Sequence, residues 1–228
     1  MKKVLVCLLG IMLVLGIAGC AKSDSNLFKK DYESVNGKEN SHGKLHREIT
    51  IPEDNVFVMS SSSEVLKKIE NKDTFYIYFG SKLCPWCRST IVKANEIATL
   101  KGVSKIYYVD IWDDDGNEIL RDKYILDENG KAVIEKEGTS DYQKLLTTFD
   151  NLLEDYTLTT SDGKKVLVGE KRIFAPNYIY VEKGIPTKLV TGISDKQKDS
   201  REELTLEILK DEEDIFNDFF TEVCRDAC

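Results

Sequence analysis

The sequence has few histidines and prolines, and its charge balance is acidic. Of its 228 residues, 2 are histidine and 4 are proline, and 32 Lys+Arg stand against 40 Asp+Glu, giving a formal net charge of −8. An acidic chain lacks the basic face that binds nucleic acid or an anionic membrane surface. Both histidines lie before residue 50. A histidine-based active site in the rest of the chain is therefore excluded.

Long hydrophobic runs are also missing outside the first twenty residues, so no later segment is expected to span a bilayer. Residues 2–3 are lysines, 4–17 are apolar, and 17–20 read Ile-Ala-Gly-Cys. This order is typical of a signal peptide, and its end resembles the lipobox of bacterial lipoproteins. The resemblance implies that 1–19 are removed and that a lipid on Cys20 anchors the chain to the outer face of a Gram-positive cell membrane. The alternative is an ordinary secretory signal with a chance cysteine.

Residues 20–50 are mainly polar, with few positions that could be buried. Such a segment cannot bury enough apolar surface to offset the entropy of ordering it, which predicts a flexible tether between membrane and domain. His42 and His46 fall in this segment. Their spacing would suit a metal on a helix, but Gly43 disfavours a helix here. We therefore expect both histidines to be solvated.

Residues 51–228 are long enough for one domain with a single core. Strand and helix patterns alternate, which predicts an α/β fold. Residues 112–172 carry their own hairpin and helix signals, and we predict that they form an α+β insertion. The other predicted elements are a strand at 56–59, a helix from 61, strands at 74–79 and 105–111 around a helix at 85–100, a hairpin at 178–191 and a helix from 201.

The sequence Cys84-Pro85-Trp86-Cys87 lies where the buried strand meets the helix. A helix N-terminus carries partial positive charge and unpaired N–H groups, which stabilise a thiolate there. Pro85 suits the first helical turn, where its missing N–H costs nothing. We therefore predict Cys84 as the exposed attacking thiol and Cys87, which begins an apolar helix stripe, as the resolving thiol. Positive charge from Lys82 and Arg88 is expected to favour the thiolate further.

A CxxC pair that follows a buried strand and opens a helix, in an exported chain, resembles the thioredoxin superfamily. The resemblance covers residues 55–111 and 174–225. It implies that 51–228 adopt a thioredoxin-like fold, a central mixed sheet flanked by helices, interrupted by the insertion. It also implies thiol–disulfide exchange without cofactor or metal, on protein substrates and with a protein redox partner.

Members of this superfamily carry a cis-proline that faces the CxxC pair and helps to hold the substrate chain. Pro186 lies in an Ile-Pro-Thr string that copies the usual local sequence. Pro176 immediately precedes the strand at 178–181, where the superfamily places this proline, and we choose it on topology. The substrate-binding residues that the resemblance implies are Pro85, Trp86, Ala175 and Pro176.

Two features depart from thioredoxin itself. Tyr78 occupies the position of its buried aspartate, and the dipeptide between the cysteines is Pro-Trp. The direction of electron flow therefore stays open. The lipobox, the CxxC pair, the insertion and the string Arg-Ile-Phe-Ala-Pro at 172–176 together resemble the thioredoxin-like lipoproteins of Gram-positive bacteria that are grouped with bacteriocin-transport accessory proteins.

A second cysteine pair, Cys224 and Cys228, closes the chain. We expect a local disulfide that would unwind the helix end, since a regular i,i+4 spacing holds the Cβ atoms too far apart. A second redox pair and a four-thiolate zinc site with Cys84 and Cys87 are the alternatives.

The sequence thus predicts a membrane-tethered, extracytoplasmic thiol–disulfide oxidoreductase, with the insertion 112–172 as the place of partner specificity. The competing hypothesis is a non-catalytic lipoprotein of the same fold. In that protein the Cys84–Cys87 bond would be structural and the insertion would bind a partner.

Overall fold

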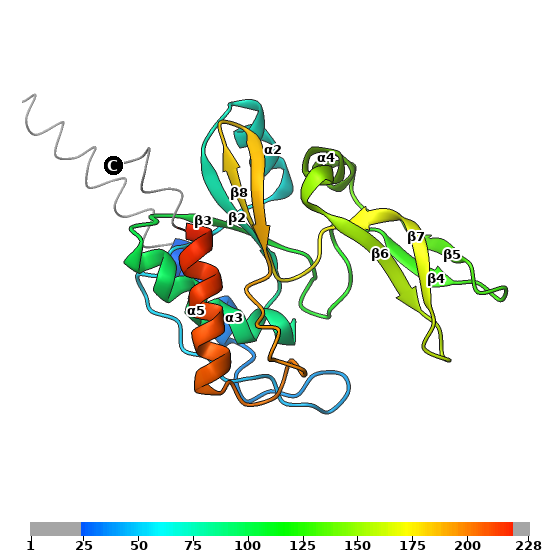
Figure 1. Ribbon diagram of the computed structural model, residues 1–228, viewed down its shortest axis with the longest axis horizontal. Helices are drawn as coiled ribbons and strands as arrows, with labels where there is room; N and C mark the ends of the chain where they lie inside the picture. Colours follow the sequence, from blue (N-terminus) through cyan, green and yellow to red (C-terminus); the bar gives the residue numbers. More distant parts are fainter. Residues whose placement is uncertain (1–23, 221–228) are drawn as a thin grey trace, which may run out of the picture.

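The computed structural model describes residues 24–220 and has a mixed five-stranded sheet at its centre (Figure 1). β1, β3 and β2 are parallel, whereas β8 and β9 run antiparallel to their neighbours. The α/β class is therefore confirmed. In spatial order the strands are β1 (Phe57–Met59), β3 (Ile106–Asp110), β2 (Phe75–Gly80), β8 (Asn177–Glu182) and β9 (Ile185–Val190).

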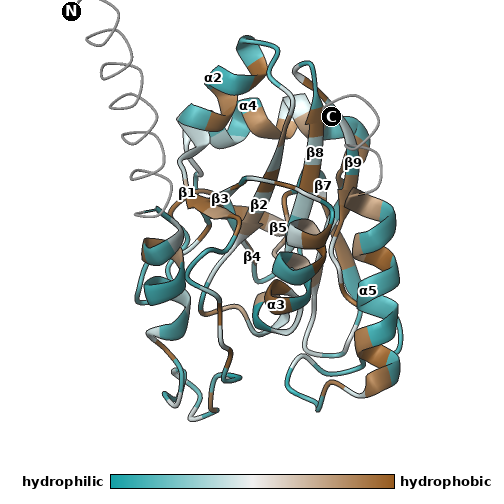
Figure 2. Ribbon diagram, turned by 90° about the vertical axis from the view of Figure 1, so that its left-hand side faces the viewer, coloured by the Kyte–Doolittle hydropathy of each residue, from teal (hydrophilic) through white to brown (hydrophobic). Residues whose placement is uncertain are grey.

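Helices cover both faces of this sheet (Figure 2). On one face α3 (Pro85–Leu100) and α5 (Leu206–Phe220) pack on Tyr76 and Tyr78 of β2. On the other face α2 (Ser62–Glu70) and α4 (Ser140–Phe149) pack near Ile77 and Phe79. Successive side chains of a strand point to opposite faces, so one fully buried strand supplies both cores.

Local sequence explains where the two helices after β1 and β2 begin. Ser61 accepts a hydrogen bond from the Glu64 N–H, and the Glu64 carboxylate accepts one from the Ser61 N–H. This reciprocal capping box is the one expected from the sequence. At α3, Cys84 is the N-cap and Pro85 the first helical residue. The CxxC pair is thereby fixed at the end of the central strand.

The insertion lies between β3 and β8. Its two hairpins extend to one side of the sheet, while α4 lies against the sheet (Figure 1). Several of its apolar side chains are exposed, among them Ile134 and Leu167. Its role in partner specificity stays a prediction. Besides α4, the insertion contains β4 (Lys123–Leu126), β5 (Ala132–Lys136), the 3-10 turn η1 (Asp150–Leu152), β6 (Glu154–Thr159) and β7 (Lys165–Arg172).

The segment before β1 differs from the flexible tether predicted over 20–50. Residues 24–33 are helical, and Phe28 and Tyr32 are fully buried in the core that also contains α3. Ile49 and Ile51 are buried in the same core. A few apolar side chains at helical spacing are enough to dock this otherwise polar segment. Residues 20–23, like the predicted signal peptide and Cys20, lie outside the described residues.

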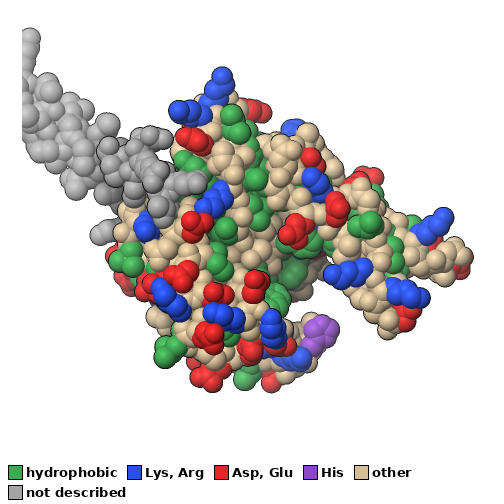
Figure 3. Space-filling model, in the orientation of Figure 1, with side chains coloured by type: hydrophobic (Ala, Val, Ile, Leu, Met, Phe, Trp, Pro, Cys, Tyr) green, Lys and Arg blue, Asp and Glu red, His purple; other side chains and the backbone are tan. Residues whose placement is uncertain are grey.

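His46 is also buried, which corrects the expectation that both histidines are solvated; His42 is exposed. Across residues 24–220, no helix has the length and apolar character needed to cross a membrane. Acidic and basic side chains are interspersed over the face shown in Figure 3. Cys224 and Cys228 lie outside the described residues, so the expected disulfide and its two alternatives stay predictions.

Glu212 of α5 predicts a pH-dependent stability. Its side chain is fully buried, and neither carboxylate oxygen has a hydrogen-bond partner among the described residues. Burial raises its pKa to about 7, against opposing effects of Lys93 and Arg47. The folded state therefore binds a proton that the unfolded chain releases near its ordinary Glu pKa, so this contribution to stability is lost as pH rises from about 4.5 through about 7.

The Glu212→Gln variant should consequently gain stability relative to the wild type as pH rises. Urea unfolding at pH 5 and pH 8 measures this difference. Glu207→Gln, at an exposed position of the same helix, is the matched control. A constant difference between Glu212→Gln and the wild type at both pH values would contradict the expectation.

Candidate functional site

The two thiols of the CxxC sequence lie at the start of α3, where the expected helix N-terminus is found. The Cys87 N–H donates a hydrogen bond to Cys84 Sγ at 3.3 Å. Cys84 is thus the helix N-cap through its sulfur, in the position that oxygen-bearing side chains usually occupy. The central strand β2 ends only four residues earlier, at Gly80, so the pair lies at the C-terminal end of this strand.

The exposure of Cys84 was predicted wrongly. Its side chain is only 4% exposed, and that of Cys87 is fully buried, as expected. The Cys84 thiol contacts the carbonyl oxygen of Ala175 at 3.5 Å, and Trp86 and Trp112 pack against the same core. Ala175 lies in a loop and Trp112 in the insertion, and both are far from Cys84 in sequence. Local sequence therefore could not reveal this burial.

The two thiols have pKa values shifted in opposite directions. A hydrogen bond from the Cys87 thiol lowers the pKa of Cys84, and the backbone N–H groups of Cys87 and Trp86 and the charge of Arg121 act in the same direction against the effect of burial. Burial raises the pKa of the Cys87 thiol well above its ordinary value. Of the two thiols, Cys84 is therefore the one that ionises at the lower pH.

The loop opposite the thiols contains the proline chosen from topology. The Ala175–Pro176 peptide bond is cis, and this loop brings the Ala175 carbonyl oxygen to Cys84. Pro186 lies instead within β9. The substrate-binding roles of Pro85, Trp86, Ala175 and Pro176 stay predictions.

Of the two positive charges expected near the thiols, that of Lys82 is paired with carboxylates and that of Arg88 is not. Lys82 forms ion pairs with Asp31 at 2.7 Å and with Asp114 at 2.5 Å, so its charge is compensated. Arg88 is fully buried, and no carboxylate of the described residues forms an ion pair with it. Its guanidinium donates to the carbonyl oxygens of Tyr32, Lys82 and Arg47 and to the side-chain oxygen of Asn36. Arg88 is therefore the uncompensated cation beside the pair.

Arg121 was not identified from the sequence. It extends from the insertion, where its guanidinium bonds the Glu118 carboxylate and donates to the Ile173 carbonyl oxygen at 3.2 Å. This second contact holds it close to the loop that carries Ala175. The sequence around it offers only an acidic and a basic residue three positions apart, a pattern common on protein surfaces. Its placement beside Cys84 depends on tertiary packing alone.

Tyr78 places a hydroxyl group where the resemblance to the thioredoxin superfamily predicts a carboxylate. Its hydroxyl lies 2.7 Å from that of Tyr32, and its ring stacks on Tyr178 at 4.5 Å between centroids. A hydrogen bond from Tyr78 also lowers the pKa of Cys87, although burial outweighs it. The buried side of Cys87 is thus lined by tyrosine hydroxyls.

The Tyr78→Phe variant should slow the reaction of Cys87 about threefold to tenfold, because the resolving thiolate loses a hydrogen bond. The rate at which Cys84 is alkylated should change little. Stopped-flow resolution of a preformed mixed disulfide at Cys84 measures the first quantity, and iodoacetamide labelling the second. Tyr107→Phe, on the opposite face of the sheet, serves as control. An unchanged resolution rate would rule out this role.

Within residues 24–220 no group of three or more His, Cys, Asp or Glu side chains is arranged to hold a metal ion. Comparison of the sequence with protein-family models and with curated proteins finds no match. The parallel β1-β3-β2 arrangement, the flanking helices and the Cys84–Cys87 pair are nevertheless consistent with a thioredoxin-like fold that carries a CxxC site.

Proposed function

We propose that this chain is a thiol–disulfide oxidoreductase that acts on cysteines of proteins. The observation that carries the proposal is the asymmetry of the pair. Cys84 has a lowered pKa at a helix N-cap, and Cys87, one turn further on, has a raised one. An attacking thiolate beside a protonated resolving thiol is the arrangement that dithiol exchange requires.

In the reducing direction, the Cys84 thiolate attacks one sulfur of a substrate disulfide. The Cys84–substrate bond forms, the substrate disulfide breaks, and the other substrate sulfur leaves as a thiolate. Cys87 then loses its proton to solvent or to that leaving thiolate and attacks Cys84 Sγ. The substrate is released with both sulfurs reduced, and the pair is oxidised. The oxidising direction is the reverse sequence, and a second protein would restore the starting state of the pair.

The loop around cis-Pro176 is proposed to hold the substrate chain next to Cys84. Its Ala175 carbonyl oxygen already lies within hydrogen-bond distance of the thiol. An extended substrate segment would donate a backbone N–H to this loop carbonyl, as an added strand does at a sheet edge. Recognition through backbone groups suits an enzyme with many protein substrates.

The proposed location is the outer face of a cell membrane, with a lipid on Cys20 as the anchor. The lysines, the apolar run and the Ile-Ala-Gly-Cys string at 17–20 support this part of the proposal. An oxidising compartment is also where protein disulfides form and persist, so substrates would be present there.

The proposed function is tested by following exchange between the purified chain and a peptide that contains two cysteines, in both its reduced and its disulfide form. Mass spectrometry of alkylated samples reports the thiol content over time. We expect exchange well above the rate of the uncatalysed reaction with the wild type, and none above that rate with the double variant Cys84→Ser/Cys87→Ser. An inactive wild type would favour the non-catalytic protein with a structural Cys84–Cys87 disulfide.

A further inference from the structure

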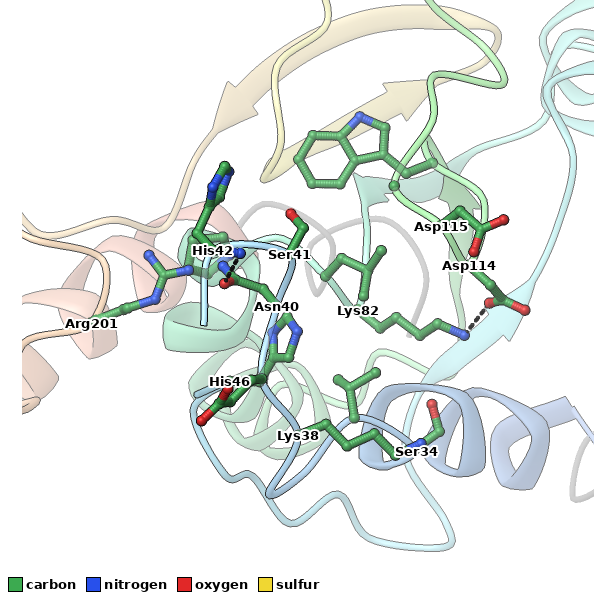
Figure 4. A pocket seen from close by; sticks show the side chains of 16 residues that line it. Ser34, Lys38, Asn40, Ser41, His42, His46, Lys82, Asp114, Asp115 and Arg201 are labelled. Carbon is green, nitrogen blue, oxygen red and sulfur yellow. Dashed lines mark hydrogen bonds and ion pairs between the residues drawn. The ribbon is translucent and has the colours of Figure 1, made fainter. Parts of the chain in front are cut away.

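A cavity of about 680 Å³ lies beside the CxxC pair (Figure 4). Three parts of the chain form most of its wall: the segment 34–46, the loop 82–85 and the turn 112–116. Leu83 and Pro85, the two neighbours of Cys84, both line it. A polypeptide whose cysteine is joined to Cys84 would therefore have its adjacent residues next to this cavity.

The two sides of the cavity carry different charges (Figure 4). Arg201 lies on one side with His42 and His46, and Lys38 lies beside Ser34 between the two sides; neither Arg201 nor Lys38 forms an ion pair within the described part of the chain. On the other side Asp114 is paired with Lys82, and Asp115 lies beside it. Glu39 also belongs to the lining. The cations that have no ion pair among the described residues thus come from the N-terminal segment and from the loop at 201.

Backbone and side-chain contacts build this cationic side. The His46 N–H donates to the Lys38 carbonyl oxygen at 2.9 Å, which places these two residues next to each other. The neighbouring Arg47 donates to the Glu202 carbonyl oxygen at 2.5 Å, which ties the loop at Arg201 to the same segment. These contacts fix the backbone positions of Lys38, His46 and Arg201 relative to one another.

Two donor groups on this side have no protein partner. His46 is only 6% exposed, and its ring has no hydrogen bond to any described residue. The Nε of Arg201 is buried and is likewise unpartnered among residues 24–220. A buried donor without an acceptor is costly, so the Arg201 Nε favours an acceptor from outside the chain at this place.

We propose that this cavity binds an acidic side chain of the polypeptide substrate, a few residues from the cysteine that reacts with Cys84. The carboxylate would pair with Arg201 and accept a hydrogen bond from His46, and the unpaired charge of Lys38 would add a longer-range attraction. Asp114, Asp115 and Glu39 would repel a more highly charged anion, so a single carboxylate fits the charges best. The inference rests on the proposed function and names its substrate class.

The test uses the full chain with the Cys87→Ser substitution, so that the reaction stops at the first attack. Its substrates are eight-residue peptides with one cysteine activated as a 2-pyridyl disulfide. The Cys84 thiolate attacks the peptide sulfur, the peptide–Cys84 disulfide forms, and pyridine-2-thione leaves and is measured by its absorbance. Glu, Ala or Lys is placed in turn at each position on either side of the cysteine. The Cys84→Ser/Cys87→Ser chain gives the background from other thiols.

We expect the Glu peptide to react about tenfold faster than the Ala peptide at one or two positions on the same side of the cysteine, and the Lys peptide to react more slowly. Lys38→Gln with Arg201→Gln should bring the Glu-to-Ala ratio close to one. Lys105→Gln, an exposed lysine outside the cavity, should leave that ratio unchanged. Equal rates for all three peptides would overturn the inference and leave the oxidoreductase intact. No reaction with any peptide would contradict both this inference and the proposed oxidoreductase function.

Discussion

Replacing Cys84 by serine is expected to reduce thiol–disulfide exchange at least about a thousandfold, because the hydroxyl that remains is not a nucleophile for disulfides at neutral pH. Cys87 cannot take over this role. It is fully buried, and burial raises the pKa of its thiol well above the ordinary value. Initial rates with a two-cysteine peptide measure the loss. Residual activity within tenfold of the wild type would contradict the assignment of Cys84 as the attacking thiol.

Cys87→Ser is the matched variant, and it should behave differently from Cys84→Ser. The first attack by Cys84 remains, but no second thiol resolves the mixed disulfide. The chain should therefore accumulate as a covalent adduct with its substrate, visible by mass and released by a reductant. The pKa of Cys84 should also rise in this variant, because the hydrogen bond from the Cys87 thiol is the largest effect that lowers it. A hydroxyl at position 87 replaces that bond only in part.

Replacing Arg88 by methionine is expected to destabilise the protein by about 3 kcal/mol or more. The guanidinium is fully buried, and its donors bond the oxygens of Tyr32, Asn36 and Arg47. Each buried acceptor left without a donor costs about 1–3 kcal/mol. Because these oxygens belong to the N-terminal segment, we expect this segment to detach first. Urea unfolding gives the stability, and limited proteolysis between residues 34 and 47 gives the detachment.

Arg88→Lys separates the charge of this residue from its hydrogen bonds. A lysine keeps the positive charge near Cys87 but cannot reproduce the planar set of donors. The N-terminal segment should loosen in both variants, whereas the pKa of Cys87 should rise further only in Arg88→Met, in which the uncompensated cation is gone. Thiolate absorbance near 240 nm, followed as a function of pH, measures the pKa of Cys87 in each of the two variants. Equal stability of the wild type and Arg88→Met would contradict the role of Arg88 in holding the N-terminal segment.

Much of the sheet and the site could be predicted because their signals are local. The aromatic run of β2, the capping box at Ser61 and the CxxC pair after a strand each depend on a few adjacent residues. The cis-proline was also found, because strand order discriminated between Pro176 and Pro186. Such features follow from backbone geometry and helix capping, which nearby side chains decide.

The features that were missed depend on contacts between distant segments. The N-terminal helix looked too polar to fold, but Phe28 and Tyr32 reach a core made by residues far along the chain. Arg121 and Ala175 lie close to Cys84 because the insertion and the cis-proline loop pack against the rest of the fold. Periodicity and composition contain no information on such approaches. The sequence therefore predicted the effect of the helix N-terminus on the pKa of Cys84, but not the effects of its burial and of Arg121.

The reduction potential of the Cys84–Cys87 pair tests the central claim most directly. The full chain is equilibrated with a series of glutathione buffers, and the fluorescence of Trp86 reports the state of the pair, with Cys84→Ser/Cys87→Ser as the blank. A stabilised Cys84 thiolate favours the reduced form, so we predict a reversible two-electron transition with a potential above about −200 mV. A pair that stays oxidised throughout the series would be a structural disulfide, and the oxidoreductase proposal would be wrong.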